Sequence, residues 1–214
     1  QQESELLSKL RKEELEKENL KAKINAAIKI EIAEAEAKRK KAESAAKAKA
    51  VEKGTAVTEA KVELAETKEM VLSSKNFEGN KGRLPWPVEK GTITEGFGKN
   101  PHPTLSGVFT NNNGIDISAP KNAQVRAVFE GEVTSILNIP GAGKVVIVKH
   151  GNYRTVYSNL QNVYVEKGSK VTTKQVIGSL VKKDGQSVSV AHFEIHQVVG
   201  SSVNSLNPKL WIVN

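Results

Sequence analysis

Four histidines are the side chains in this sequence best suited to bind a metal or to transfer protons: His102, His150, His192 and His196. Imidazole is a common metal ligand, and its ordinary pKa of about 6.5 suits proton transfer near neutral pH. His192 and His196 lie in an alternating run that predicts a strand, so both should face the same side of a sheet. His150 closes an apolar run and is expected to be structural, and His102 is expected in a surface loop.

Other catalytic and binding chemistries find little support. The sequence contains no cysteine, which excludes disulfides and thiolate metal sites. No serine lies in a nucleophile-elbow sequence, so a Ser-His-Asp hydrolase is not predicted.

The elements that must position these histidines are strands. After Trp86 the sequence consists of short apolar runs separated by Gly, Asn and Pro, and no helix of any length is expected beyond residue 80. This pattern is typical of an antiparallel sheet or sandwich. Strands are expected at 93–97, 114–117, 125–133, 133–137, 144–150, 153–157, 170–171, 176–181 and 188–195.

The first 50 residues differ, because they are rich in Glu, Lys, Ala, Leu and Ile, which favour helix. Leu6, Leu10, Leu20, Ile24 and Ile28 recur at helical spacings among charges of alternating sign. A narrow apolar stripe on a solvated helix is typical of a coiled coil. The arm is either one half of an intrachain hairpin or part of a dimer; its alternative role is a simple spacer.

Gly54 and Thr55 interrupt this helix, and a second helical segment is predicted at Thr58–Ser73. Prolines on both sides of Trp86 then mark the entry into the β region. We therefore predict three parts: a coiled-coil helical arm (1–53), a helical segment and linker with a regulatory role (54–84), and a β domain (85–214).

The net charge and the first residues of the chain indicate which partners and which location to expect. The net charge is +8, and residues 80–214 contain 15 basic and 8 acidic side chains. Such a balance suits anionic wall polymer or ordinary solubility, and no basic run interleaved with aromatics predicts nucleic-acid binding. The chain begins at Gln1 and has no apolar run long enough to span a bilayer. We interpret it as a mature or truncated piece whose export signal is absent.

An ordered series of motifs in the β region resembles the LytM/lysostaphin family of peptidoglycan endopeptidases. The series covers about residues 86–212. Its members are 114–120 (GIDISAP), 128–133 (VFEGEV), 150–151 (HG), 155–160 (TVYSNL), 165–171 (VEKGSKV), 175–178 (QVIG), 192–195 (HFEI) and 207–208 (NP).

The resemblance implies a zinc site made by a His, an Asp four residues later and the second His of a His-x-His, with two further histidines assisting the attacking water. Here Asp116 and His192 are retained. The first ligand position holds Asn112, the first His of His-x-His is Val190, and the other assisting position holds Asn159. An amide is a poor zinc ligand, and neither Val nor Asn transfers protons. We therefore expect a degenerate domain with no metal, no cofactor and no catalysis.

The order of a coiled coil followed by a degenerate LytM domain resembles the EnvC-type murein hydrolase activators of Gram-negative bacteria. The resemblance implies a periplasmic regulator that activates N-acetylmuramoyl-L-alanine amidases at the division septum, with the coiled coil engaging an FtsEX-type membrane complex. Peptidoglycan is a further expected partner; nucleic acid is not. The expected binding groove contains Asn112, Asp116, Tyr157, Asn159, His192 and His196.

Regulation is expected through the segment Thr58–Ser73, lying over this groove as an autoinhibitory helix. Two alternatives remain: an active zinc-dependent endopeptidase with substitute ligands, and a passive wall-binding module.

Overall fold

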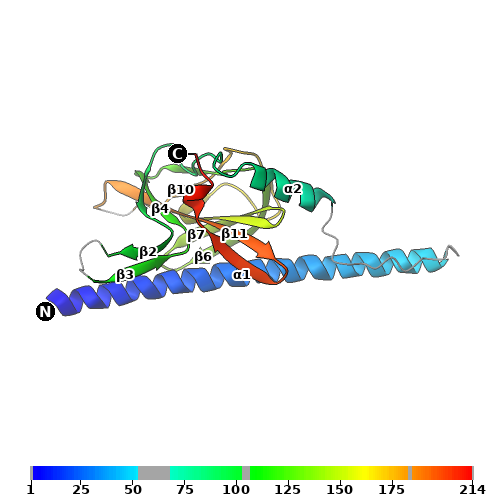
Figure 1. Cartoon of the computed structure of the whole chain (residues 1–214), viewed down its shortest axis with the longest axis horizontal. Coiled ribbons are helices and arrows are strands. Elements are labelled where there is room, and N and C mark those ends of the chain that lie inside the picture. Colours follow the sequence, from blue (N-terminus) through cyan, green and yellow to red (C-terminus); the bar gives the residue numbers. More distant parts are fainter. Residues whose placement is uncertain (1, 53–67, 103–106, 183–184, 214) are drawn as a thin grey trace.

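The computed structural model describes residues 2–52, 68–102, 107–182 and 185–213. Two helices precede a β domain: α1 (Gln2–Glu52) and α2 (Lys68–Gly79). α1 runs along one side of the β domain and continues past it, whereas α2 lies on the opposite side (Figure 1). No helix in the described part of the chain is both long enough and apolar enough to cross a bilayer.

One antiparallel sheet forms most of the β domain and confirms the predicted fold class. Its central strands run in the order β1-β4-β11-β8-β7-β6-β9, β10 joins β8 to β5, and β12 pairs with β11. β2 and β3 form a separate hairpin. The strands are β1 (Thr92–Glu95), β2 (Gly98–Pro101), β3 (Phe109–Asn112), β4 (Ile115–Pro120), β5 (Gln124–Arg126), β6 (Gly131–Ile139), β7 (Gly143–His150), β8 (Tyr153–Val163), β9 (Lys170–Val171), β10 (Val176–Leu180), β11 (Val188–Val199) and β12 (Ser202–Leu206), followed by the 3-10 turn η1 (Pro208–Leu210).

The two faces of the sheet belong to two hydrophobic clusters. Alternation along β4, β11, β8 and β7 sends residues such as Ile117, Phe193 and Val146 into the main core of the domain. The residues between them point to the other side, where Val145, Ile147, Val156 and Val198 form a second cluster. We call this second side of β4, β11, β8, β7 and β6 the covered face, because α1 packs against its aliphatic part on β6, β7, β8 and β11.

The predicted apolar stripe of α1 is what covers this face. Leu20, Ile24, Ala27 and Ile28 are buried and pack against the second cluster. Full burial of a side chain such as Leu or Ile contributes about 1.5–3 kcal/mol, so the contact is a substantial one. The stripe therefore packs on the sheet of its own chain, and a coiled-coil partner for α1 remains a prediction.

Ion pairs hold α1 on both sides of the apolar stripe. The ammonium of Lys17 lies 2.8 Å from Glu95 of β1, and Glu31 lies 2.7 Å from the guanidinium of Arg154 in β8. One turn further along, Glu34 lies 3.4 Å from Lys167 in an exposed pair. The two partly buried pairs fix the position of the helix along the covered face.

The helix predicted to end at Ser73 continues further along the chain in the structure. Residues 58–67 lie outside the described part of the chain, and α2 continues past the predicted end at Ser73 to Gly79. Phe77 explains the longer helix, because it is fully buried in the domain core. Its ring stacks on His150 and Tyr153 at centroid distances of 4.7 and 5.0 Å. This burial outweighs the weak helix preference of Ser and Asn.

The described part of this segment does not cover the predicted groove. α2 packs beside β7 on the core side, where the hydroxyl of Ser74 accepts a hydrogen bond from the backbone N–H of Asn152. Only residues 68–73 of the expected regulatory segment are described, so its placement over the groove stays a prediction; among the described residues, α1 lies over the covered face.

Candidate functional site

Neighbouring strands bring Asp116, His192, Glu194 and His196 together on the covered face. In the sheet register His192 of β11 pairs with Asp116 of β4, and His196 pairs with Arg154 of β8. Residues 192, 194 and 196 alternate to the same side of β11, as the sequence predicted for the two histidines. These groups form one continuous polar row beneath α1.

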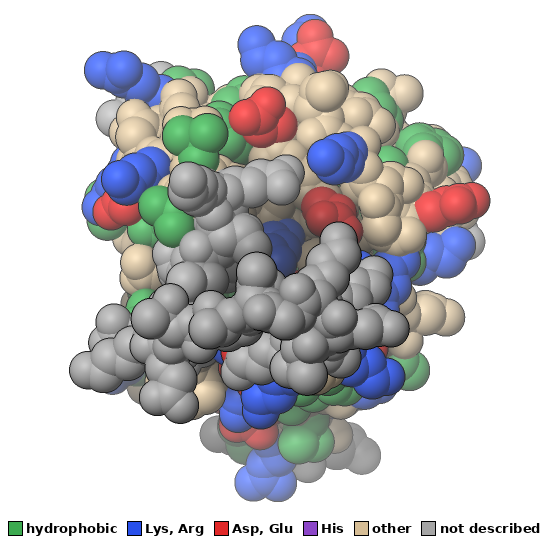
Figure 2. Space-filling view, turned by 90° about the vertical axis from the view of Figure 1, so that its right-hand side faces the viewer, with side chains coloured by type: hydrophobic (Ala, Val, Ile, Leu, Met, Phe, Trp, Pro, Cys, Tyr) green, Lys and Arg blue, Asp and Glu red, His purple; other side chains and the backbone are tan. Residues whose placement is uncertain are grey.

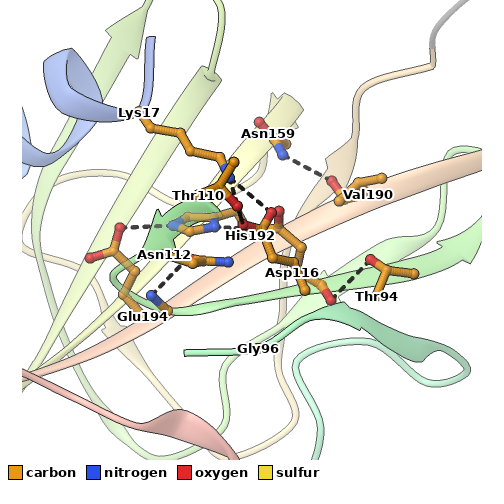
Figure 3. Close-up of polar contacts among 12 residues, drawn as sticks. Lys17, Thr94, Gly96, Thr110, Asn112, Asp116, Asn159, Val190, His192 and Glu194 are labelled. Atoms are coloured by element: carbon orange, nitrogen blue, oxygen red, sulfur yellow. Dashed lines mark hydrogen bonds and ion pairs between the residues drawn. The ribbon is translucent and has the colours of Figure 1, made fainter. Parts of the chain in front are cut away.

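Both ring nitrogens of His192 donate to carboxylates (Figure 3). Nδ1 lies 2.6 Å from Oδ1 of Asp116, and Nε2 lies 2.8 Å from Oε1 of Glu194. A ring that donates from both nitrogens is an imidazolium. Burial favours the neutral ring, but the hydrogen bonds and charges of the two carboxylates outweigh it and raise the pKa of His192 to about 10.

The pKa values of the two carboxyl groups shift in the opposite direction. Burial disfavours their ionised forms, but hydrogen bonds and charges from His192 and His196 lower the pKa of Glu194 to about 2. For Asp116, burial is likewise outweighed by the hydrogen bond and charge of His192 and by the charge of Lys17, so its pKa is also lowered. Asp116, His192 and Glu194 thus form a buried network of opposite charges.

His196 extends this network. Its Nε2 donates to Oε2 of Glu194 over 2.6 Å, and the hydroxyl of Ser205 lies 3.4 Å from its Nδ1. Only 1% of His196 is exposed, so it is not a solvated edge residue. Glu194, which joins the two histidines, was missed by the sequence analysis, although the alternation that linked His192 to His196 also places residue 194 between them.

Two other predicted positions border the network. Asn112 is buried, and its side-chain oxygen accepts a hydrogen bond of 3.0 Å from the backbone N–H of Gly114. Asn159 donates from Nδ2 to the backbone oxygen of Val190 over 3.2 Å (Figure 3). In the described structure, the Nδ2 of Asn112 and the hydroxyl of Ser158 are buried without a hydrogen-bond partner.

Tyr157 does not lie on the covered face. Its ring packs on Phe193 at a centroid distance of 5.4 Å, inside the main core. Its hydroxyl accepts a hydrogen bond of 2.9 Å from the backbone N–H of Val128, and burial raises the pKa of Tyr157 to about 12. The prediction that Tyr157 lines the groove is corrected, because alternation along β8 exposes residues 154, 156 and 158 to that side instead.

His150 has the structural role predicted for it. It bonds the backbone oxygen of Glu130 at 2.6 Å and the hydroxyl of Thr155 at 2.8 Å, within the core and under the ring of Phe77. Burial is the main reason that the pKa of His150 falls to about 3. The ring is therefore neutral near physiological pH.

The residues present do not fit a catalytic zinc site. Such a site needs three protein ligands with free lone pairs and a fourth position open to water. The first ligand position holds Asn112, whose side-chain oxygen bonds the backbone N–H of Gly114, and the aliphatic Val190 cannot act as a base. Within the described residues, no group of three or more His, Cys, Asp or Glu side chains is placed to hold a metal ion.

The surface charge around the domain is mixed. On the face drawn in Figure 2, basic and acidic side chains are interspersed among polar and apolar ones. A surface of one sign, of the kind that follows a phosphate backbone, is not present on the visible described part of that face. The covered face is therefore the better candidate for a binding surface.

Comparison with known proteins finds a family and several proteins to which this chain is similar. Residues 110–207 match the model of peptidase family M23. The chain is 28% identical to the murein hydrolase activator EnvC of Escherichia coli over 99% of this chain and 47% of EnvC. It is 32% identical to the peptidoglycan DD-endopeptidase ShyB of Vibrio cholerae over 51% of this chain and 26% of ShyB.

Among solved structures, Csd3 of Helicobacter pylori is similar with a TM-score of 0.50 and 28% identity, over 61% of this chain and 35% of that chain. The chain spans less than half the length of both curated relatives. Over residues 110–207, the chain is therefore similar to peptidase family M23.

Proposed function

We propose that this chain is a non-catalytic regulator of peptidoglycan hydrolysis, which binds and activates cell-wall amidases through its covered face. The observation that carries the proposal is the state of His192. Both of its ring nitrogens are engaged by carboxylates, while amide and aliphatic side chains occupy the other expected ligand and base positions. This chemistry supports recognition rather than hydrolysis.

The similarity to the activator EnvC, which extends along nearly the whole chain, supports the same assignment. On this proposal the protein acts in the periplasm at the division septum, and the helical arm engages an FtsEX-type membrane complex. Its direct target is an N-acetylmuramoyl-L-alanine amidase, with peptidoglycan as a further ligand.

Activity is controlled in this proposal by α1. In the closed chain, Leu20, Ile24 and Ile28 occupy the aliphatic part of the covered face. Movement of α1, which is the helical arm, away from the sheet frees the face for the amidase. Such a switch requires the closed and open states to differ by only a few kcal/mol, so that a membrane complex can shift the population.

The test compares the full chain with an Ile24→Asp variant, in which a buried carboxylate disfavours docking of α1. Purified amidases of the same bacterium are assayed for binding and for release of dye-labelled fragments from sacculi. We expect the variant to bind and activate an amidase more strongly than the parent chain. Equal binding by both would contradict control by α1.

The same assay addresses the alternatives. Release of muropeptides by the chain alone with added zinc would establish an endopeptidase, the activity for which its relative ShyB is named. Pelleting with sacculi that disappears at high salt, without any effect on amidases, would establish a passive wall-binding module.

A further inference from the structure

Arg154 is a buried cation on the covered face whose position is fixed from the domain side. Only 1% of the residue is exposed. Its Nη1 donates to the backbone oxygens of Gly151 and Tyr153 over 2.6 and 2.9 Å. Both acceptors belong to the β7–β8 turn and to β8 itself. The guanidinium therefore keeps its orientation whether or not α1 is present.

The other side of the guanidinium faces α1. Nε donates to Oε2 of Glu31 over 2.7 Å, and Nη2 donates to Oε1 over 2.8 Å. This is a two-point pairing of guanidinium with carboxylate, which is among the stronger and more directional of protein interactions. Lys149 lies 3.6 Å from the same carboxylate and adds a second positive charge.

Opening of the face, on the function proposed above, separates this pair. A guanidinium is a permanent cation in proteins, so a partner must meet it with an acceptor. The cross-strand partners of Arg154 are Lys149 and His196, and the aliphatic side chains of Ile147, Val156 and Val198 follow on the same side of the neighbouring strand positions. A partner that covers this surface without supplying an acceptor leaves a desolvated, unpaired cation, which weakens binding considerably.

We propose that Arg154 is a carboxylate receptor for the partner protein. Glu31 occupies it in the closed chain, and an acidic side chain of the amidase, presented among aliphatic ones, occupies it in the complex. The aliphatic surroundings favour a protein over a wall peptide, because the surface that Leu20, Ile24 and Ile28 cover requires apolar side chains to replace them. The inference rests on the proposed function, and it names the chemistry of the partner's contact.

The test uses the full chain and a purified N-acetylmuramoyl-L-alanine amidase of the same bacterium as the probe. The dissociation constant is measured for the parent chain, Glu31→Ala, Glu31→Ala with Arg154→Gln, and Glu31→Ala with Arg154→Lys. Glu34→Ala serves as the control, because it removes an exposed acid of the same helix. Thermal unfolding of each variant verifies that the domain is folded.

A receptor role of Arg154 and a role limited to holding Glu31 predict different dissociation constants for the double variants. If Arg154 receives a carboxylate, Glu31→Ala tightens binding, and adding Arg154→Gln weakens it by at least about 10-fold, with Arg154→Lys in between. If Arg154 serves only to hold Glu31, both double variants bind as tightly as Glu31→Ala, which overturns the inference. Should Arg154→Gln not fold, the Arg154→Lys comparison decides alone.

The same measurements distinguish failure of the Arg154 proposal from failure of the proposed activator function. If neither the parent chain nor Glu31→Ala binds any amidase, the activator assignment itself fails. If amidases bind but the dissociation constants of both double variants equal that of Glu31→Ala, only the receptor role of Arg154 fails. Arg154-dependent pelleting with sacculi, without Arg154-dependent amidase binding, would assign the carboxylate to the wall and overturn the inference as well.

Discussion

Ile24→Ala is expected to undock α1 without unfolding the β domain. Ile24 has no exposed surface, and it packs in the second cluster, which is separate from the main core. Truncating a buried Ile to Ala costs about 2–5 kcal/mol. If that cost falls on the docked state alone, the equilibrium for undocking rises by roughly 30- to 4,000-fold.

Hydrogen exchange of backbone amides measures this change directly. Amides of residues 20–31 should exchange faster in the variant, because an undocked helix in water is only marginally stable. Amides of β7 and β8 that belong to the main sheet should retain most of their protection. Ile30→Ala is the matched control, because Ile30 lies on the same helix and is 58% exposed.

Two results would refute the reasoning. One is equal exchange in Ile24→Ala and Ile30→Ala, which would show that the second cluster does not hold α1. The other is equal acceleration in α1 and in the strands, which would show that helix and sheet unfold as one unit and that no separate switch exists.

Three further predictions concern stability. The parent chain should lose about 2 kcal/mol of stability as the pH falls from 6.5 to about 5, and His150→Gln should abolish this loss. The pKa of the buried ring is lowered to about 3, so in this pH range the unfolded chain binds a proton that the folded chain does not. Urea unfolding of variant and parent at the two pH values measures this loss. An equal change of unfolding free energy with pH in both proteins would contradict the prediction. Phe77→Ala should cost about 3–5 kcal/mol in urea unfolding, whereas Leu72→Ala, 60% exposed on the same helix, should change stability little; similar losses would argue against Phe77 as the anchor of α2. Gly114→Ala should destabilise the domain severely, because a Cβ there would lie 2.1 Å from the backbone oxygen of Phe193, while Gly79→Ala meets nothing within 4 Å; comparable thermal midpoints for the two would refute this.

The β domain was predictable because its signals are local. Apolar alternation and Gly, Asn and Pro turns predicted β7, β10 and β11 closely, and the same alternation placed His192 and His196 on one face. The hairpin β2–β3 and strand β12 were missed, since their sequences are polar and short. Their pairing depends on neighbours that the local pattern does not specify.

The site was predictable only in part because faces and partners depend on register. Tyr157 was assigned to the wrong face, since which side of β8 meets α1 is fixed by its pairing with β7 and β11. Arg154 was missed for the same reason. The stripe Leu20–Ile28 on α1 was predicted to be buried, but an amphipathic stripe does not specify whether a helix or a sheet will cover it.

Dye release from labelled sacculi tests most directly whether this domain regulates hydrolysis without performing it. Three reactions are compared: the Ile24→Asp chain alone with added zinc, an amidase alone, and both together. The account predicts no release by the chain alone and more release by the mixture than by the amidase. Release of wall peptides by the chain alone, dependent on zinc, would contradict it.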